Sequence, residues 1–235
     1  MPEENKKKYT VIKTTSEAPG VVSLELSCED GTPLYIPGQF ITVYLPELGT
    51  PEGKAYSISS APNESLRITV EERGEFSRTL SALKPGGVFL ASEPEGYFYS
   101  ESKTSALVML AAGIGIAPFR SVILESLQKN SARLIHLFYS NRTMQNIVFR
   151  DEFALLAARH ESFKVHHFIT REENLPGGIT SGRMSAEAIL KAVGKAPDPE
   201  FFICGSIPFV RDMWKGLKSA GVSEERLYTE AFFAQ

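Results

Sequence analysis

The sequence predicts an N-terminal antiparallel β-barrel followed by a C-terminal α/β domain built on a parallel sheet. In the first hundred residues, short segments rich in β-branched and aromatic residues alternate with Pro-Gly, Asp-Gly and Pro-Asn turn signals, a spacing typical of a closed antiparallel sheet. After the polar stretch 101–105, apolar strand-like segments alternate with helix-like segments, the pattern of a parallel sheet with crossover helices. We therefore expect two domains, 1–102 and 103–235.

The N-terminal domain has six expected strands and one short helix. The strands are expected at residues 9–13, 21–28, 40–44, 56–59, 66–71 and 88–91. The helix is expected at 77–83, with Ser77 as its N-cap, because a serine side chain accepts hydrogen bonds from the first N–H groups of a helix.

The C-terminal domain begins with a continuous apolar run at 106–112, as expected of a parallel strand buried on both faces. Further strands are expected at 133–139, 164–170 and 200–204, and helices at 118–129, 149–160, 185–193 and 208–220. In such a sheet the loops at the carboxyl ends of the strands form the ligand-binding edge.

Composition excludes several classes of function. A formal net charge of -3 and a pI near 5.9 give no reason to expect nucleic acid as a partner. No apolar run approaches the roughly 20 residues of a membrane span, so we expect a cytoplasmic protein. Cys28 and Cys204 are too few for an iron–sulfur cluster, and the four histidines lack the spacing of a metal site, so we expect no metal.

A glycine loop follows the first parallel strand. Gly113 and Gly115 stand between that strand and a helix, where glycines let the backbone turn sharply and approach a phosphate. The helix offers unpaired N–H groups and the positive end of its dipole, and Pro118 suits its first turn. The loop therefore indicates a nucleotide site; the alternative is an ordinary tight turn.

A second small-residue loop, with Cys204 and Gly205, follows the last predicted strand and opens the last helix. Both loops leave the carboxyl edge of the sheet, so we expect them to face one crevice. For Cys204 alone, the alternative is an inert buried thiol.

Two further motifs lie in the barrel. Lys54 and Tyr56 share one face of a strand, and Ala55 and Ser57 the other; by pattern alone this segment is also compatible with an ordinary edge strand. Near the short helix, residues 74–77 read Gly-Glu-Phe-Ser, which suits either an anion cradle or a plain turn with a cap.

Taken in order, these motifs resemble the ferredoxin–NADP reductase superfamily, in its compact form without an iron–sulfur domain. The resemblance covers nearly the whole chain: an Arg-x-Tyr-Ser-type motif, Gly-x-x-Ser, Gly-x-Gly-x-x-Pro, Cys-Gly and a terminal acidic-x-aromatic ending at Glu230 and Phe232. It implies an FAD-binding barrel and an α/β domain that binds NAD(P)H.

The resemblance also implies roles for individual residues. Tyr56 would stack on the flavin, with the Ser57 hydroxyl near flavin N5, and Phe232, or alternatively Phe233, would cover the flavin face. The implied catalytic residues are Ser57, Cys204 and Glu230. The implied cofactor-binding residues are Lys54, Ala55, Tyr56, Ser57, Gly74, Phe76, Ser77, Gly113, Gly115, Pro118, Arg142, Arg171, Cys204, Gly205 and Phe232.

Two positions bear on how tightly the cofactors bind and which donor is used. Lys54 stands where the family usually has arginine; lysine keeps the charge but loses the bidentate fork, which predicts weaker FAD binding or, alternatively, no contact of Lys54 with FAD. After the second parallel strand no carboxylate occupies the place that would bind ribose hydroxyls, and Arg142 and Arg171 could pair with a 2′-phosphate. We therefore expect NAD(P)H as donor and favour NADPH slightly; the alternative is that both arginines are ordinary surface charges.

The resemblance thus predicts an FAD-dependent oxidoreductase that passes electrons from NAD(P)H to a separate acceptor, such as a ferredoxin, an oxygenase component or a small molecule. One alternative is a free-flavin reductase, for which flavin is a loosely held substrate. Another is a non-catalytic electron-transfer subunit of a larger complex.

Overall fold

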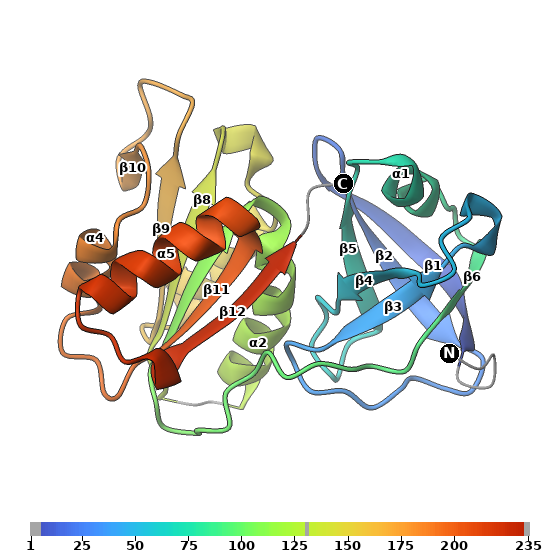
Figure 1. Ribbon diagram of the computed structural model, residues 1–235, viewed down its shortest axis with the longest axis horizontal. Helices are drawn as coiled ribbons and strands as arrows, with labels where there is room; N and C mark the ends of the chain where they lie inside the picture. Colours follow the sequence, from blue (N-terminus) through green and yellow to red (C-terminus); the bar gives the residue numbers. More distant parts are fainter. Residues whose placement is uncertain (1–5, 130–131, 233–235) are drawn as a thin grey trace. The chain divides into compact units, whose positions relative to one another are not determined.

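The computed structural model describes residues 6–129 and 132–232 and divides into two compact units (Figure 1). The first unit takes in the described residues up to Tyr99 and also Ala117–Glu125, the first part of a helix. The second takes in Ser100–Ile116 and the described residues from Ser126 onward.

The first unit is a six-stranded antiparallel sheet with the strand order β4-β3-β6-β1-β2-β5. Its strands are β1 (Lys7–Ala18), β2 (Val21–Cys28), β3 (Phe40–Tyr44), β4 (Lys54–Ser57), β5 (Leu66–Glu71) and β6 (Val88–Ala91). The two end strands meet through an antiparallel bridge between Ile58 and Ile68 and a 2.8 Å hydrogen bond from the Ser59 N–H to the Arg67 carbonyl oxygen. The sheet therefore closes, and the predicted barrel is confirmed.

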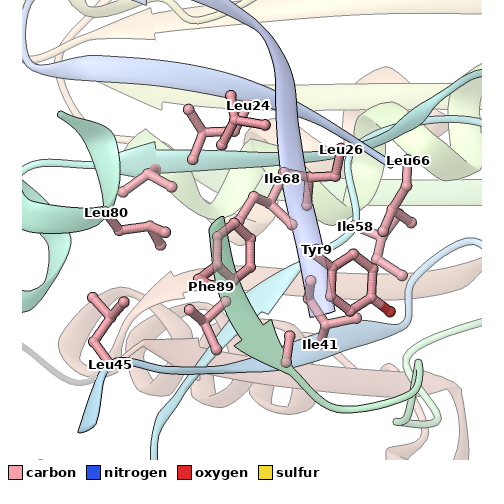
Figure 2. Close-up of a cluster of buried hydrophobic side chains, with 14 of the residues drawn as sticks. Tyr9, Leu24, Leu26, Ile41, Leu45, Ile58, Leu66, Ile68, Leu80 and Phe89 are labelled. Atoms are coloured by element: carbon pink, nitrogen blue, oxygen red, sulfur yellow. The ribbon is translucent and has the colours of Figure 1, made fainter. Parts of the chain in front are cut away.

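Side chains from alternate strand positions fill the barrel (Figure 2). Tyr9 of β1, Leu24 of β2 and Ile68 of β5 have no exposed surface. The short helix α1 (Glu75–Ser81) adds Phe76 and Leu80 to the same core. Burying a side chain of this size stabilises the fold by about 1.5–3 kcal/mol, so two such anchors fix the position of α1 on the barrel.

The second unit contains six parallel strands in the order β10-β9-β8-β7-β11-β12. The strands are β7 (Leu107–Ala112), β8 (Ile135–Asn141), β9 (Phe163–Ile169), β10 (Ile179–Ser181), β11 (Glu200–Ser206) and β12 (Leu227–Phe232). β7 lies between β8 and β11, so the strand order reverses there. In a sheet of this kind, such a reversal is where ligands bind.

The helices of the second unit that pack on the parallel sheet are α3 (Arg150–Arg159), α4 (Ala186–Val193) and α5 (Ile207–Ser219). Another helix, α2 (Ala117–Gln128), begins in the first unit and ends in the second. Ile189 of α4 and Leu217 of α5 belong to one buried cluster with Val108, Phe138 and Ile203 of the strands. No helix among the described residues is both long enough and apolar enough to cross a membrane.

Several expected boundaries were wrong. β1 runs over Lys7–Ala18 rather than 9–13 because two β-bulges let it continue along β2, and β4 begins at Lys54 rather than residue 56. α1 begins two residues earlier than predicted. The strands β10 and β12 were missed: β10 has three mostly exposed residues, and β12 is an edge strand with no fully buried position.

Candidate functional site

Aromatic and charged side chains join β4 to α1 in the first unit. Lys54 and Tyr56 are half-buried on β4, whereas Ala55 between them is exposed. The Tyr56 ring stacks on Phe76, with centroids 6.4 Å apart and planes 18° apart. Lys54 Nζ lies 5.1 Å from the centroid of the same Phe76 ring, within cation–π range. The structure therefore brings the two barrel motifs together.

Ser57, the last residue of β4, is 5% exposed, and its Oγ has no hydrogen-bond partner among the described residues. A buried hydroxyl left without a hydrogen bond costs about 1–3 kcal/mol, so the position suits a bound group that offers a hydrogen-bonding atom. Burial raises the pKa of the adjacent Tyr56 phenol well above its usual value, so this ring is neutral. A neutral aromatic ring beside a buried hydroxyl fits a planar, hydrogen-bonding ligand such as a flavin.

The turn before α1 differs from the prediction in one respect. Gly74, not Ser77, is the N-cap, and Ser77 stands three residues into the helix. Ser77 Oγ accepts hydrogen bonds from the N–H groups of Arg73 at 2.9 Å and Gly74 at 3.1 Å, and donates to the Gly74 carbonyl oxygen. The hydroxyl therefore stabilises the turn itself, and a role in holding a pyrophosphate stays a prediction.

The glycine loop of the second unit forms a 3-10 turn, η3 (Gly113–Ile116), between β7 and α2. A Cβ on Gly115 would lie 2.3 Å from the carbonyl oxygen of Cys204 and 2.8 Å from the N of Gly205. A Cβ on Gly205 would lie 2.9 Å from Cβ of Ala112. The turn after β7 therefore lies directly against the end of β11, and only glycine permits this approach. The second loop predicted at Cys204 and Gly205 was wrong, because both residues belong to β11, which runs to Ser206 and leads directly into α5.

Cys204 and Glu230 face each other in the pairing of β11 with β12. Cys204 is fully buried; burial, and to a lesser extent the Glu230 carboxylate, raise the pKa of its thiol well above the usual value. Burial also raises the pKa of Glu230 to about 7, and its Oε2 has no hydrogen-bond partner within the described part of the chain. Glu230 is thus a carboxyl group that can hold or release a proton near neutral pH.

The end of β12 carries the predicted aromatic residue. Phe232 is the last residue of the strand and is half-buried. Phe233, its alternative, lies outside the described residues.

Arginines gather at the carboxyl edge of β8, β9 and β10. Arg142 follows β8, Arg171 follows β9, and the Arg171 N–H donates a 2.9 Å hydrogen bond to the Arg142 carbonyl oxygen. Arg183 follows β10, and all three side chains are exposed. Arg183 was missed because its strand was missed. None of the three forms an ion pair with another residue in 6–129 or 132–232.

Comparisons with known proteins find oxidoreductases among the chain's relatives. A family profile described as an oxidoreductase NAD-binding domain matches residues 109–215. Ferredoxin–NADP reductase B of Sorangium cellulosum is 30% identical over 232 residues, which cover 92% of this chain and 93% of that protein. The flavohemoprotein of Bordetella pertussis is 30% identical over 241 residues, which cover 95% of this chain; the chain spans 60% of that relative's length.

A solved structure shows the same fold. The crystal structure of a ferredoxin NADP+ reductase from Neisseria gonorrhoeae with bound FAD and NADP superposes with a TM-score of 0.82 at 22% identity. The match covers 97% of this chain and 99% of the other.

Proposed function

Because this chain belongs to the ferredoxin–NADP reductase superfamily, we propose that it is a reductase that passes electrons from NAD(P)H through a bound FAD to a separate acceptor. The observation that carries this proposal is the unpartnered Ser57 hydroxyl, buried at the end of β4 beside the half-buried Tyr56 ring. When bound, FAD accepts two electrons as hydride and releases them one at a time, chemistry that side chains cannot supply.

The barrel residues bind and orient the flavin. Tyr56, which stacks on Phe76, would offer its ring as a stacking surface for the flavin, and Ser57 Oγ would donate or accept a hydrogen bond there. Lys54 contributes a positive charge without the fork of an arginine. Gly74 has open space around its Cα and lies at the start of α1, where a phosphate group can approach the backbone.

The second unit and α2 bind the nicotinamide nucleotide. Gly113 has open space around it, and the N–H groups at the start of α2 suit a pyrophosphate. Gly205 and the uncharged Cys204 thiol are buried and pack directly against Gly115, so in this proposal they shape the nicotinamide site from behind that turn. Glu230 holds a proton near neutral pH, and Phe232 ends the same strand with an aromatic ring that the family resemblance implies would lie against the flavin.

The arginine edge favours NADPH over NADH. Arg142, Arg171 and Arg183 are exposed at neighbouring strand ends, and an arginine fork matches phosphate oxygens. The 2′-phosphate is the group that distinguishes NADPH from NADH.

The acceptor we propose is a ferredoxin-like protein, an oxygenase component or a small molecule. A free-flavin reductase is the second candidate, supported by Lys54 in place of the expected arginine. A cytoplasmic location stays a prediction from the sequence.

A visible absorption spectrum of the purified protein, followed by anaerobic titration with NADH and NADPH separately, tests the proposal. We expect flavin absorption bands that NADPH bleaches at a lower concentration than NADH does. A colourless protein that reduces added flavin would identify a free-flavin reductase. Bound FAD that neither nucleotide reduces would identify a non-catalytic subunit.

A further inference from the structure

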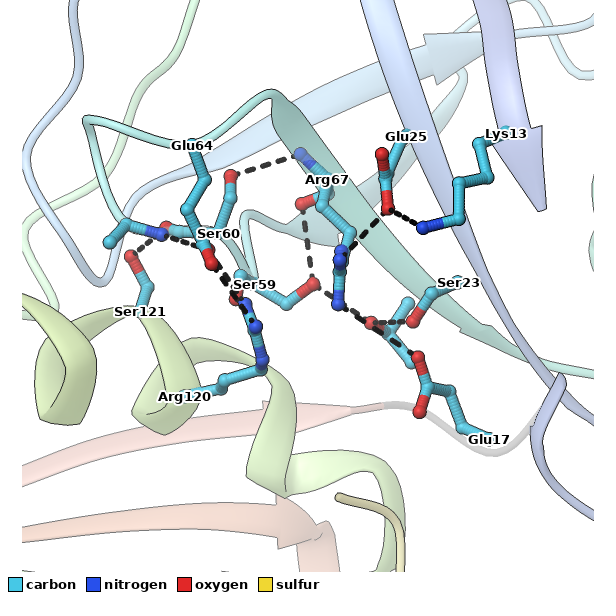
Figure 3. A network of polar contacts seen from close by, with 12 residues as sticks. Lys13, Glu17, Ser23, Glu25, Ser59, Ser60, Glu64, Arg67, Arg120 and Ser121 are labelled. Atoms are coloured by element: carbon cyan, nitrogen blue, oxygen red, sulfur yellow. Dashed lines mark hydrogen bonds and ion pairs between the residues drawn. The ribbon is translucent and has the colours of Figure 1, made fainter. Parts of the chain in front are cut away.

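One arginine on α2 joins this helix to the barrel in the first unit (Figure 3). Arg120 is 2% exposed. Its Nη1 donates hydrogen bonds to the Ser59 carbonyl oxygen at 2.6 Å and to Glu64 Oε2 at 2.9 Å, and Nη2 donates to Glu64 Oε1 at 3.4 Å. A single guanidinium thus holds both carboxylate oxygens and one backbone carbonyl.

Ser121, the next residue of α2, also hydrogen-bonds to this segment of the barrel. Ser121 Oγ donates a 2.5 Å hydrogen bond to the Ser60 carbonyl oxygen. The Tyr35 hydroxyl donates to the same carbonyl oxygen at 3.1 Å and lies 2.8 Å from Ser60 Oγ. The Ala61 N–H donates to Glu64 Oε2 at 2.9 Å, which fixes the carboxylate on its own loop. Residues 59–64 are therefore held by α2 at two consecutive side chains.

The Arg120–Glu64 pair is charged at neutral pH. Burial opposes ionisation of Glu64, but hydrogen bonds from Arg120 and from the Ala61 N–H outweigh it and hold the pKa of Glu64 below its ordinary value. Arginine keeps its proton in proteins. Because an apolar pair of similar size often stabilises a fold as much as a buried ion pair does, the pair is better explained by the position it imposes than by the stability it adds.

The Arg120–Glu64 pair holds together two segments that lie next to proposed cofactor-binding residues. Ser59 and Ser60 lie two and three residues after Ser57 in the chain, and Arg120 lies in the first turn of α2, two residues after Pro118. Under the proposed function, Ser57 contacts the flavin and the start of α2 receives the nucleotide pyrophosphate.

We propose that Arg120 is a positioning residue, which together with Glu64 sets the place of the first turn of α2 relative to the end of β4 and thereby the alignment needed for hydride transfer. This inference rests on the proposed function. Alignment matters because a displacement of about 1 Å can slow a reaction by about a hundredfold.

The test is the rate of anaerobic flavin reduction at saturating NADPH, measured by stopped flow in the FAD-loaded protein. We expect Arg120→Gln to slow reduction at least about tenfold while the NADPH dissociation constant changes less. Glu64→Gln should slow it in the same direction, and the double variant should be no slower than Arg120→Gln alone, because paired residues act as one unit. Arg120→Lys should restore part of the rate, since it keeps the charge but loses the fork.

Arg67→Gln is the matched control. Arg67 lies in the same unit, but its guanidinium pairs with Glu25 at 2.9 Å rather than with α2 (Figure 3). We expect a lower Tm and an unchanged rate of flavin reduction for Arg67→Gln.

The proposal is overturned if Arg120→Gln and Glu64→Gln lower only Tm, or if Arg67→Gln slows flavin reduction as much as they do. Should Arg120→Gln fail to fold, Glu64→Gln and Arg120→Lys decide the matter. A wild-type protein that neither nucleotide reduces would instead contradict the proposed function.

Discussion

Two of the residues that we propose for the cofactor sites carry a buried polar atom without a partner among the described residues. Ser57 Oγ in the first unit and Glu230 Oε2 in the second are buried without partners among the residues that the structure describes. The sequence predicts both residues through motif resemblance alone, because burial of a side chain depends on neighbours from distant strands. Arg120 was not predicted at all, since its partner Glu64 lies 56 positions away and no local pattern links the two.

Glu230 should make stability depend on pH. Its pKa is about 7 in the folded chain and near 4.5 when unfolded, so folding takes up a proton between these values and stability falls as pH rises through this window. Relative to Glu230→Gln, we expect the free energy of unfolding of the wild type to fall by about 3 kcal/mol from pH 4 to pH 8. Urea titrations followed by Trp214 fluorescence measure this difference. Parallel pH profiles for the two proteins would contradict the assignment.

Secondary-structure elements were predicted correctly where the side-chain pattern within the element itself indicates its type and its ends. β2, β3, β5 and β6 have the expected bounds because their inward side chains alternate between turn signals. β10 and β12 escaped prediction because edge strands bury little apolar surface and so lack that pattern. The close approach at the glycines was predicted because a sharp turn from strand to helix is required within a few residues, and a short stretch of sequence shows it.

Gly115→Ala should separate the turn after β7 from the end of β11. Its Cβ would lie 2.3 Å from a backbone oxygen of Cys204, which cannot rotate away as a side chain would. We expect a loss of about 1–3 kcal/mol in stability, as for other overpacked positions, and a raised KM for NADPH. Gly177→Ala is the control, because nothing lies within 4 Å of its Cβ. Equal behaviour of the two variants in urea unfolding and in KM would refute the close approach.

Over the molecule as a whole, charge is distributed unevenly. The chain has a formal net charge of -3, yet three exposed arginines follow neighbouring strands at one sheet edge. Sequence reasoning identified Arg142 and Arg171 but not Arg183, because placing Arg183 at this edge requires knowing that β10 pairs with β9.

Neutralising this edge should change the choice of donor. We expect the triple variant Arg142→Gln, Arg171→Gln, Arg183→Gln to raise KM for NADPH at least about tenfold, since one charge-assisted hydrogen bond contributes about 1.5–3 kcal/mol. KM for NADH should change by no more than about twofold. Arg159→Gln, at the end of α3, is the control. Steady-state assays with each nucleotide decide the matter, and an equal change for both would refute a 2′-phosphate site.

The fully buried Cys204 makes chemical labelling of the folded protein selective. Cys28, at the end of β2, is partly exposed, whereas Cys204 offers no surface to a reagent. The chain therefore has one natural attachment point for a maleimide dye or spin label, on the barrel and outside the parallel-sheet unit. A reporter can be placed there without engineering any residue that we propose for cofactor binding.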